Sequence, residues 1–381
     1  MPEAVIVSAL RTPIGTAFKG TLRDTTAFDL AHHVVTAAAR GLDPEQVDDV
    51  ILGEGLYGGG VVARHAAVTA GLTSVAGLAL NRHCAAGLSA VQAAAASIRA
   101  GMDGLVIAGG VNSASTAPRS RFRVDGEWVD PWHPPTHPDR PDAPNLDMSI
   151  TVGWNAAVRA GVSREEMDAW ALRSHRNAVR AIDEGRFDAE IVPIETGHGL
   201  FAVDEHPRRS TSLEKLASLK PLHPEIEGFS ITAGNAGGAN DGAAALVVAS
   251  DRLGLPALAT VRAWASAGVD PAETGLAPVK AIPKALARAG LSVADVDLFE
   301  INEAFAAMCV ATVGALGLDP ELVNVNGSGC SLGHPVAATG ARMVVTLVHE
   351  LRRRGGGVGV AAMCAGGGMG SAAVIEVPAP R

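Results

Sequence analysis

Two short segments of the chain, separated by about two thirds of its length, resemble each other. Segments 41–54 and 290–303 match at five positions, and the two members of every pair are 249 residues apart. Five matches between two helix-to-strand units can arise by chance, but Cys84 and His334 are separated by nearly the same distance, 250 residues, and each precedes an apolar helix. We therefore expect two related halves that place a thiol and an imidazole at equivalent helix starts, facing each other across a pseudo-two-fold axis. The matching pairs are Gly41/Gly290, Leu42/Leu291, Val47/Val296, Asp48/Asp297 and Glu54/Glu303.

The halves are expected to form one α/β body. No Pro/Ser-rich or charged stretch is long enough to be a free linker in these 381 residues. Glycine is abundant (44) and aromatic residues are few (4%), which suits closely packed helices and tight strand-to-helix turns. Because strands alternate with helices, we predict parallel sheet. We expect strands over 3–8, 104–108, 244–249, 296–301, 357–363 and 371–377, and helices over 26–40, 86–100 and 163–185, the last opened by a Ser163/Glu166 capping box.

Charge and hydropathy exclude several classes of partner. The net charge is −9, and no run of Lys and Arg is clustered, which argues against nucleic acid or an anionic membrane surface. The N-terminus lacks a signal-peptide pattern, and no apolar run reaches about 18 residues, so we expect a cytoplasmic protein. The four cysteines are scattered without CxxC spacing, so neither a zinc cage nor a disulfide framework is indicated. An important cysteine here is a reactive thiol.

Cys84, in NRHCAAGLSA (81–90), is the candidate nucleophile. It stands immediately before a helix of small residues, where the helix dipole stabilises a thiolate and is expected to lower the thiol pKa. The alternative is a buried, inert cysteine.

His334 is the candidate base. It lies in NVNGSGCSLGHPVAATGAR (324–342), where glycines permit sharp turns and Pro335 suits the first helical position. A neutral imidazole there can take the proton from Cys84, whereas the alternative is a structural histidine.

Two further motifs carry polar groups at the ends of strands. Cys364 lies in AAMCAGGGMGSA (361–372), where a buried strand enters a glycine-rich turn. The spacing fits no nucleotide-binding loop, but backbone N–H groups of such a turn can hold an oxyanion, and a cysteine beside them can move a proton. Asn302, in INEAFA (301–306), ends another strand, and its alternative role is helix capping.

Together these motifs resemble the thiolase family nearly from end to end. VSALRTPIG (7–15), DEHPRRSTSLEKLASLKP (204–221) and TAGNAGGANDGAAA (232–245) occur in the order that thiolases have. The resemblance implies two βαβαβαββ halves, 1–251 and 257–381, in a five-layer αβαβα arrangement, with a loop region inserted over about 119–231. It also implies a homodimer or homotetramer. Coenzyme A and acyl-CoA are implied as substrates, with no permanently bound cofactor and no metal.

The resemblance also implies roles for the candidate residues. Cys84 is the acylated nucleophile, His334 its base, and Cys364 the acid/base for the α-carbon proton. Asn302, through a water, and His334 form one oxyanion site, and the N–H groups of Cys84 and Gly366 form the other. For coenzyme A, Arg208 matches an arginine at the nucleotide end. Ala236 and Gly237 lie in the stretch that contacts the pantetheine.

Three features depart from the family pattern. Gly237 replaces a usual serine, and Thr274 stands where a methionine commonly lines the acyl end. The Pro-rich segment 119–145, with Trp128 and Trp132, differs from the usual covering loop. We expect an irregular or polyproline-like excursion that acts as a lid bordering the acyl pocket or as an oligomer contact; the alternative is a surface loop.

The expected activity is that of an acetyl-CoA C-acyltransferase or acetyltransferase, with cleavage of 3-ketoacyl-CoA favoured over synthesis. A β-ketoacyl synthase-like condensing enzyme and a catalytically silent acyl-CoA-binding or lipid-binding homologue remain as alternatives.

Overall fold

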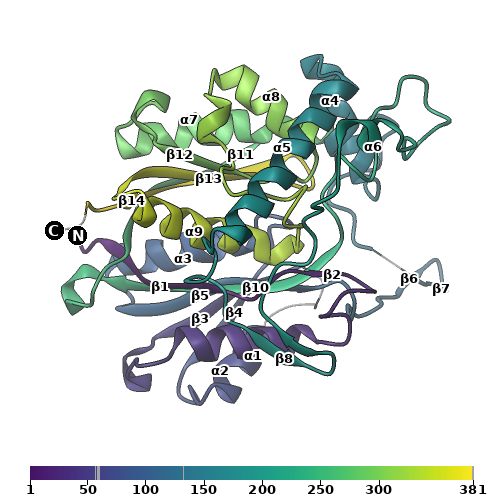
Figure 1. Ribbon diagram of the computed structural model, residues 1–381. Helices are drawn as coiled ribbons and strands as arrows, with labels where there is room; N and C mark the ends of the chain where they lie inside the picture. The colour runs from purple at the N-terminus through teal and green to yellow at the C-terminus, as the bar shows by residue number, and fades with distance from the viewer. Residues whose placement is uncertain (56, 58–60, 132, 380–381) are drawn as a thin grey trace.

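The computed structural model describes residues 1–55, 57, 61–131 and 133–379. Helices and sheets alternate in five layers (Figure 1). Helices α1 and α2 form one outer layer, α3 and α9 form the central layer between the two sheet regions, and α7 and α8 form the other outer layer. The predicted thiolase-type α/β architecture is confirmed. The helices are α1 (Ala27–Ala38), α2 (Val61–Thr69), α3 (Ala86–Ala100), α4 (Asn155–Ala160), α5 (Arg164–Asp183), α6 (Leu213–Ala217), α7 (Ala277–Ala289), α8 (Ala306–Leu316) and α9 (Val336–Arg353).

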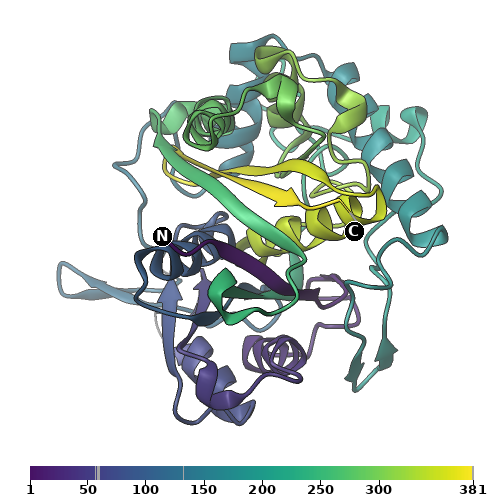
Figure 2. The ribbon, with the colours of Figure 1, turned by 90° about the vertical axis from the view of Figure 1, so that its left-hand side faces the viewer.

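The strands of both halves join into one continuous sheet within the described residues, in the order β12-β13-β14-β11-β1-β10-β5-β3-β4, with β2 beside β10. Figure 2 shows β11 in green between the yellow C-terminal strands and the purple β1. The two halves meet where β1 pairs with β11, through Val5↔Thr260 and Ile6↔Ala259. The strands are β1 (Ala4–Arg11), β2 (Gly15–Thr16), β3 (Asp49–Glu54), β4 (Ala76–Leu80), β5 (Leu105–Ser113), β10 (Asn240–Ser250), β11 (Ala259–Gly268), β12 (Leu298–Ile301), β13 (Gly357–Ala365) and β14 (Met369–Val377).

The prediction of parallel sheet is wrong for much of this sheet, which is mixed. Pairing is parallel between β3 and β4, β3 and β5, and β12 and β13. Pairing is antiparallel where β10 joins β1 and β5, and where β14 joins β11 and β13. The last case has a simple cause: only three glycines, 366–368, separate β13 from β14, and so short a connection can join only antiparallel strands.

The repeated segments occupy equivalent places. In each half, a glycine with positive φ follows an outer helix, a short 3₁₀ turn comes next, and the chain then enters β3 or β12. The repeated aspartates do the same work: Asp48 Oδ2 accepts hydrogen bonds from the N–H groups of Gly104 and Leu105, and Asp297 Oδ2 accepts one from Val358. Each aspartate thus ties the incoming strand to the start of its parallel neighbour, which explains why both halves keep it.

The region inserted between β5 and β10 contains α4, α5, α6 and two small hairpins. The predicted capping box of α5 is present, because Ser163 and Glu166 exchange side-chain-to-backbone hydrogen bonds. Segment 119–145 is not wholly irregular: it contains an exposed hairpin that projects from the body (Figure 1). The hairpin strands are β6 (Phe122–Val124) with β7 (Glu127–Val129), and β8 (Ile194–Thr196) with β9 (Gly199–Phe201). Within the described part of the chain, no helix is both long and apolar enough to cross a bilayer.

Candidate active site

One cavity brings together the motifs that the sequence singled out. It has a volume of about 340 Å³, and its lining includes Cys84, His334, Cys364 and Gly366. The two central helices explain this meeting. Helices α3 and α9 pack against each other so closely that a Cβ on Gly87 would lie 2.6 Å from the carbonyl oxygen of Ala337. Because Cys84 precedes α3 and His334 precedes α9, the pairing of the helices brings thiol and imidazole to the same cavity.

Cys84 keeps partial exposure at the cavity wall. Burial nevertheless raises the pKa of its thiol to about 11, and the backbone N–H of Gly366, which hydrogen-bonds to the sulfur, offsets this only in part. The prediction of a lowered thiol pKa is therefore wrong. A helix N-terminus favours the thiolate, but walls contributed by distant parts of the chain desolvate it. The Cys84 thiol is therefore neutral near pH 7.

His334 is nearly buried, with 8% exposure, and its backbone N–H donates to Asn240 Oδ1 at 2.9 Å. Gly333 directly before it has φ +102°, and any Cβ there would lie within 2.6 Å of the Asn240 side chain, so only glycine fits. Burial, with a contribution from Arg342, lowers the pKa of His334 to about 4. The imidazole is therefore neutral near pH 7 and can accept a proton.

The hydroxyl of Thr339 determines which ring nitrogen is free. Nδ1 of His334 lies 2.7 Å from Thr339 Oγ1, and that oxygen lies 3.0 Å from the carbonyl oxygen of Pro335. Since a carbonyl can only accept, the hydroxyl donates to Pro335 and accepts from Nδ1–H. Nε2 then carries the lone pair. Thr339 is fully buried and was not singled out from the sequence.

Asn302 lies beside the imidazole, with its Nδ2 3.4 Å from His334 Nε2. It is fully buried, and its Oδ1 has no hydrogen-bond partner among the described residues. Its side-chain amide and the imidazole thus lie close enough to share a small ligand such as a water. Its backbone N–H donates to the Ala362 carbonyl on β13, and the N-cap of the next helix, α8, is Phe305. Asn302 is therefore not a helix-capping residue, which was the alternative.

Cys364 is the last residue but one of β13 and lies beside Cys84, and its Sγ contacts Met308 Sδ at 3.6 Å. Burial and the neighbouring Cys84 raise the pKa of this thiol well above its ordinary value. The glycine turn that follows requires glycine, since Gly368 has φ +79° and a Cβ there would lie 2.3 Å from the Val269 carbonyl oxygen. Thr274 supports this turn from behind, accepting the N–H of Gly368 at 2.9 Å, and is not among the cavity-lining residues.

A second, open cavity of about 660 Å³ continues outward from the first. The two share Gly237, Gly238 and Ala239. The outer cavity brings together the three predicted coenzyme A contacts, Arg208, Ala236 and Gly237, and adds Lys19 and His206, which the sequence did not indicate. Burial, Arg208 and Lys19 lower the pKa of His206 to about 4, so the fixed positive charges of this channel are Lys19 and Arg208.

The absence of a side chain at Gly237 has a local cause. A Cβ there would lie 3.1 Å from the Glu303 carbonyl oxygen and 3.2 Å from His334 Cβ. In this chain, the position between the two cavities is therefore tightly packed against the Glu303 carbonyl and the Cβ of His334.

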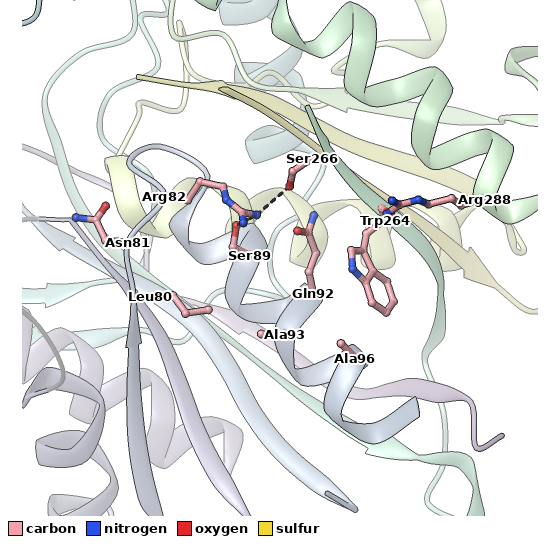
Figure 3. A pocket seen from close by; sticks show the side chains of 10 residues that line it. All are labelled: Leu80, Asn81, Arg82, Ser89, Gln92, Ala93, Ala96, Trp264, Ser266 and Arg288. Atoms are coloured by element: carbon pink, nitrogen blue, oxygen red, sulfur yellow. Dashed lines mark hydrogen bonds between the residues drawn. The ribbon is translucent and has the colours of Figure 1, made fainter. Parts of the chain in front are cut away.

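A further pocket, whose lining includes Arg82, Ser89 and Ser266, shares no lining residue with this cavity (Figure 3). Arg82 Nη1 donates to Ser89 Oγ and Ser266 Oγ, both at 2.9 Å, and so ties the loop that carries Cys84 to α3 and β11. This bracing was also missed from the sequence, because Arg82 looks like an ordinary surface charge there.

Trp128 of segment 119–145 does not border the cavity as predicted. Trp128 is 58% exposed, packs under the Arg121 guanidinium, and is not among the cavity-lining residues. Trp132 lies outside the described residues. The part of the segment that approaches the site is Thr136, since a Cβ on Gly367 would lie 3.0 Å from its Cβ.

Comparison with known proteins gives consistent matches along the whole chain. Family models described as "Thiolase, N-terminal domain" and "Thiolase, C-terminal domain" match residues 4–252 and 255–377. The chain is 42% identical to an acetyl-CoA acetyltransferase of Escherichia coli over 99% of both chains. It is 39% identical to a 3-ketoacyl-CoA thiolase of Bacillus subtilis over 99% of this chain and 100% of the other. The structure of human mitochondrial 3-ketoacyl-CoA thiolase in complex with CoA matches with a TM-score of 0.89 and 36% identity, over 99% and 98% of the chains.

Proposed function

Because the chain belongs to the thiolase family, we propose that Cys84, His334, Cys364 and Asn302 form its catalytic centre. The chain is an acyltransferase that acts between coenzyme A and 3-ketoacyl-CoA. The names of these relatives favour thiolase activity over the two alternatives, a β-ketoacyl synthase-like condensing enzyme and a catalytically silent acyl-CoA-binding or lipid-binding homologue. The observation that carries the residue assignment is the single cavity lined by Cys84, His334, Cys364 and Gly366.

The first half-reaction, written as cleavage, starts from neutral groups. Cys84 Sγ attacks the 3-keto carbon of the substrate while its proton passes to Nε2 of His334. With a thiol pKa of about 11 and an imidazole pKa of about 4, a separated thiolate–imidazolium pair is scarce at rest, so the proton moves as the sulfur attacks. The bond between carbons 2 and 3 then breaks, which leaves an acyl group on Cys84 and an enolate of acetyl-CoA.

The enolate needs a hydrogen-bonded oxygen and a proton. We propose that Asn302, through a water, and His334 hydrogen-bond to the enolate oxygen, because Asn302 Nδ2 and His334 Nε2 lie 3.4 Å apart. Cys364 supplies the proton to carbon 2; its raised pKa keeps it protonated beforehand. The N–H groups of Cys84 and Gly366 serve the oxygen of the acyl thioester on Cys84.

The second half-reaction returns each group to its starting state. Coenzyme A thiol gives its proton to the Cys364 thiolate and attacks the acyl carbon. Cys84 leaves and recovers its proton from His334. Arg208 and Lys19 line the outer channel, and their charges suit the phosphates of coenzyme A. Condensation follows the same steps in reverse. Coenzyme A is a substrate here, and no permanently bound cofactor enters these steps.

The proposal is tested by looking for a covalent acyl adduct on the protein. Incubation with acyl-CoA should add one acyl group to the protein, and peptide mass spectrometry should place it on Cys84. Cys84→Ser should lose the adduct and at least about three orders of magnitude in thiolysis rate, since a serine alkoxide is much harder to form beside a single imidazole. An adduct on another residue would refute the assignment of Cys84.

We further propose a homodimer or homotetramer of two-half subunits, divided as 1–251 and 257–381. The exposed β6–β7 hairpin supports this, because Val124, Trp128 and Val129 present apolar side chains to solvent on a projecting element. Light scattering coupled to size exclusion should give a dimer or tetramer, and Trp128→Ser should lower the assembly state if the hairpin is a contact. A monomeric wild-type chain would contradict the proposal.

A further inference from the structure

Asn112 is a buried polar residue to which the mechanism above gives no role. It lies on β5, whose side chains alternate between the two faces of the sheet. Val106 and Ala108 belong to the core cluster around the central helices, and a Cβ on Gly110 would meet the Ala337 carbonyl oxygen at the start of α9. Asn112 is next on the same face. It therefore reaches the cavity beside the start of α9, the helix that follows His334, and it lines that cavity.

The orientation of the Asn112 amide is determined by its partner. Nδ2 donates to the backbone carbonyl of Asn240 at 3.0 Å, and a carbonyl can pair only with the nitrogen end of the amide. Oδ1 therefore cannot occupy that position. Asn112 is 2% exposed, and its Oδ1 has no hydrogen-bond partner within the described residues. An unpaired buried acceptor costs stability, so its presence in a catalytic cavity calls for a ligand that donates to it.

His83 adds a second polar group to the same cavity. It directly precedes Cys84 and has φ +46°, a backbone conformation unusual for a residue other than glycine. Its ring lies beside Gly366 and Met148, since a Cβ on Gly366 would be 3.8 Å from both His83 Cγ and Met148 Sδ. Among the described residues the ring makes no hydrogen bond, and burial lowers its pKa, which leaves it neutral with one nitrogen donating and one accepting.

From these two groups we infer that the cavity contains a polar subsite for an acyl chain that carries a hydroxyl group. This rests on the proposed thiolase function and names its substrate class. A hydroxyl donates to Asn112 Oδ1 and accepts from the His83 ring. A charged group does not fit, because the described lining contains no Asp, Glu, Lys or Arg to pair with it. The remaining lining, which includes Ala114, Val152 and Val336, suits the carbon chain.

The competing ligand for Asn112 is the pantetheine arm of coenzyme A, whose amide N–H groups are also donors. Asn112 lines the inner cavity and not the outer channel that contains Lys19 and Arg208. That placement favours the acyl group. The two ligands also give different kinetics, because every substrate carries pantetheine but only some carry a hydroxyl.

The experiment is thiolysis by the wild-type protein of 3-ketoacyl-CoAs of one chain length, unsubstituted or hydroxylated at successive carbons beyond carbon 3. For at least one position we expect kcat/KM to exceed that of the unsubstituted substrate by about tenfold or more, as a hydrogen bond to an otherwise unpaired group should give. Wild-type protein that cleaves the unsubstituted substrate without preferring any hydroxylated one overturns the subsite alone. Failure to cleave any substrate overturns the thiolase proposal itself.

Variants then locate the preference. Asn112→Leu should bring the ratio of hydroxylated to unsubstituted kcat/KM to about one while thiolysis of the unsubstituted substrate continues. His83→Asn, which tolerates the same backbone conformation, should lower the ratio about threefold. Val152→Ala is the matched control. It shortens an apolar side chain of the cavity lining and so enlarges the cavity, which should change the preferred chain length while the hydroxyl preference remains. If Asn112→Leu raises KM equally for all substrates, the pantetheine is the ligand and the acyl assignment is wrong.

Discussion

Replacing Thr339 by valine removes the hydroxyl that holds the imidazole of His334. Valine nearly conserves shape, so the change isolates one contact, the 2.7 Å pairing with Nδ1. Without it, the ring loses the acceptor that holds Nδ1–H, and a buried N–H is left unpaired. A typical hydrogen bond contributes about 0.5–1.5 kcal/mol, and a buried donor without a partner costs about 1–3 kcal/mol. The corresponding loss is roughly tenfold to a hundredfold in kcat.

The assay must distinguish loss of base function from general disorder. In the proposed mechanism both half-reactions use His334, so acyl exchange between acyl-CoA and labelled coenzyme A should fall by the same factor as thiolysis. KM should change little, because Thr339 is not among the residues that line either cavity. Thr339→Ser keeps the hydroxyl and should restore most of the rate. If Thr339→Ser is as slow as Thr339→Val, or if the valine variant loses less than about twofold, the hydroxyl does not position the base.

Three other changes test separate parts of the site. Cys364→Ala should keep acyl exchange near the native rate but lower 3-ketoacyl-CoA cleavage by about a hundred- to ten-thousand-fold, the range for loss of a general acid/base; equal loss of both activities would mean that Cys364 supports Cys84 or the fold. Because the pKa of His334 is lowered to about 4, its basic form persists as the pH falls, so kcat/KM for acyl exchange should begin to drop only near pH 4 to 5; an acid limb near 6.5 in the pH profile would contradict this. Gly237→Ser should lower kcat several-fold, since the new Cβ approaches His334 Cβ at 3.2 Å, whereas an unchanged kcat with a lower KM for coenzyme A would show that the position has room for the usual serine.

The sequence predicted the arrangement of the fold well where a local pattern had only one physical reading. The 249-residue offset placed Asp48 and Asp297 in equivalent turns, and both do bind the first N–H groups of the neighbouring strand. Likewise, Ser163 and Glu166 formed the expected capping box. The antiparallel pairing of β13 with β14 also has a local sequence signal. Two apolar runs separated by a few glycines form a hairpin, and 357–363 followed by 371–377 was such a case.

The candidate site was predicted as a set of residues but not as an electrostatic environment. Cys84 was judged from the helix that follows it, which favours a thiolate. The opposing effect is burial of the thiol. The cavity around Cys84 is lined by residues such as Phe305 and Gly237, which are more than 150 positions away in sequence. Desolvation depends on such long-range packing, so a local motif cannot give the sign of the pKa shift.

The same reasoning explains why Asn112 escaped notice. In sequence it is one polar residue near the end of an apolar run, which is where a strand normally returns to solvent. The structure shows instead that strand β5 stays buried as far as Ser113. The Asn112 amide is therefore buried, with a hydrogen-bond partner for Nδ2 but none among the described residues for Oδ1. A polar residue at a strand end is informative only when its burial and its partners are both known. Thr339 makes the complementary case: its hydroxyl is fully satisfied, and its role becomes visible only because the carbonyl of Pro335 determines which way its hydrogen bond to His334 must run.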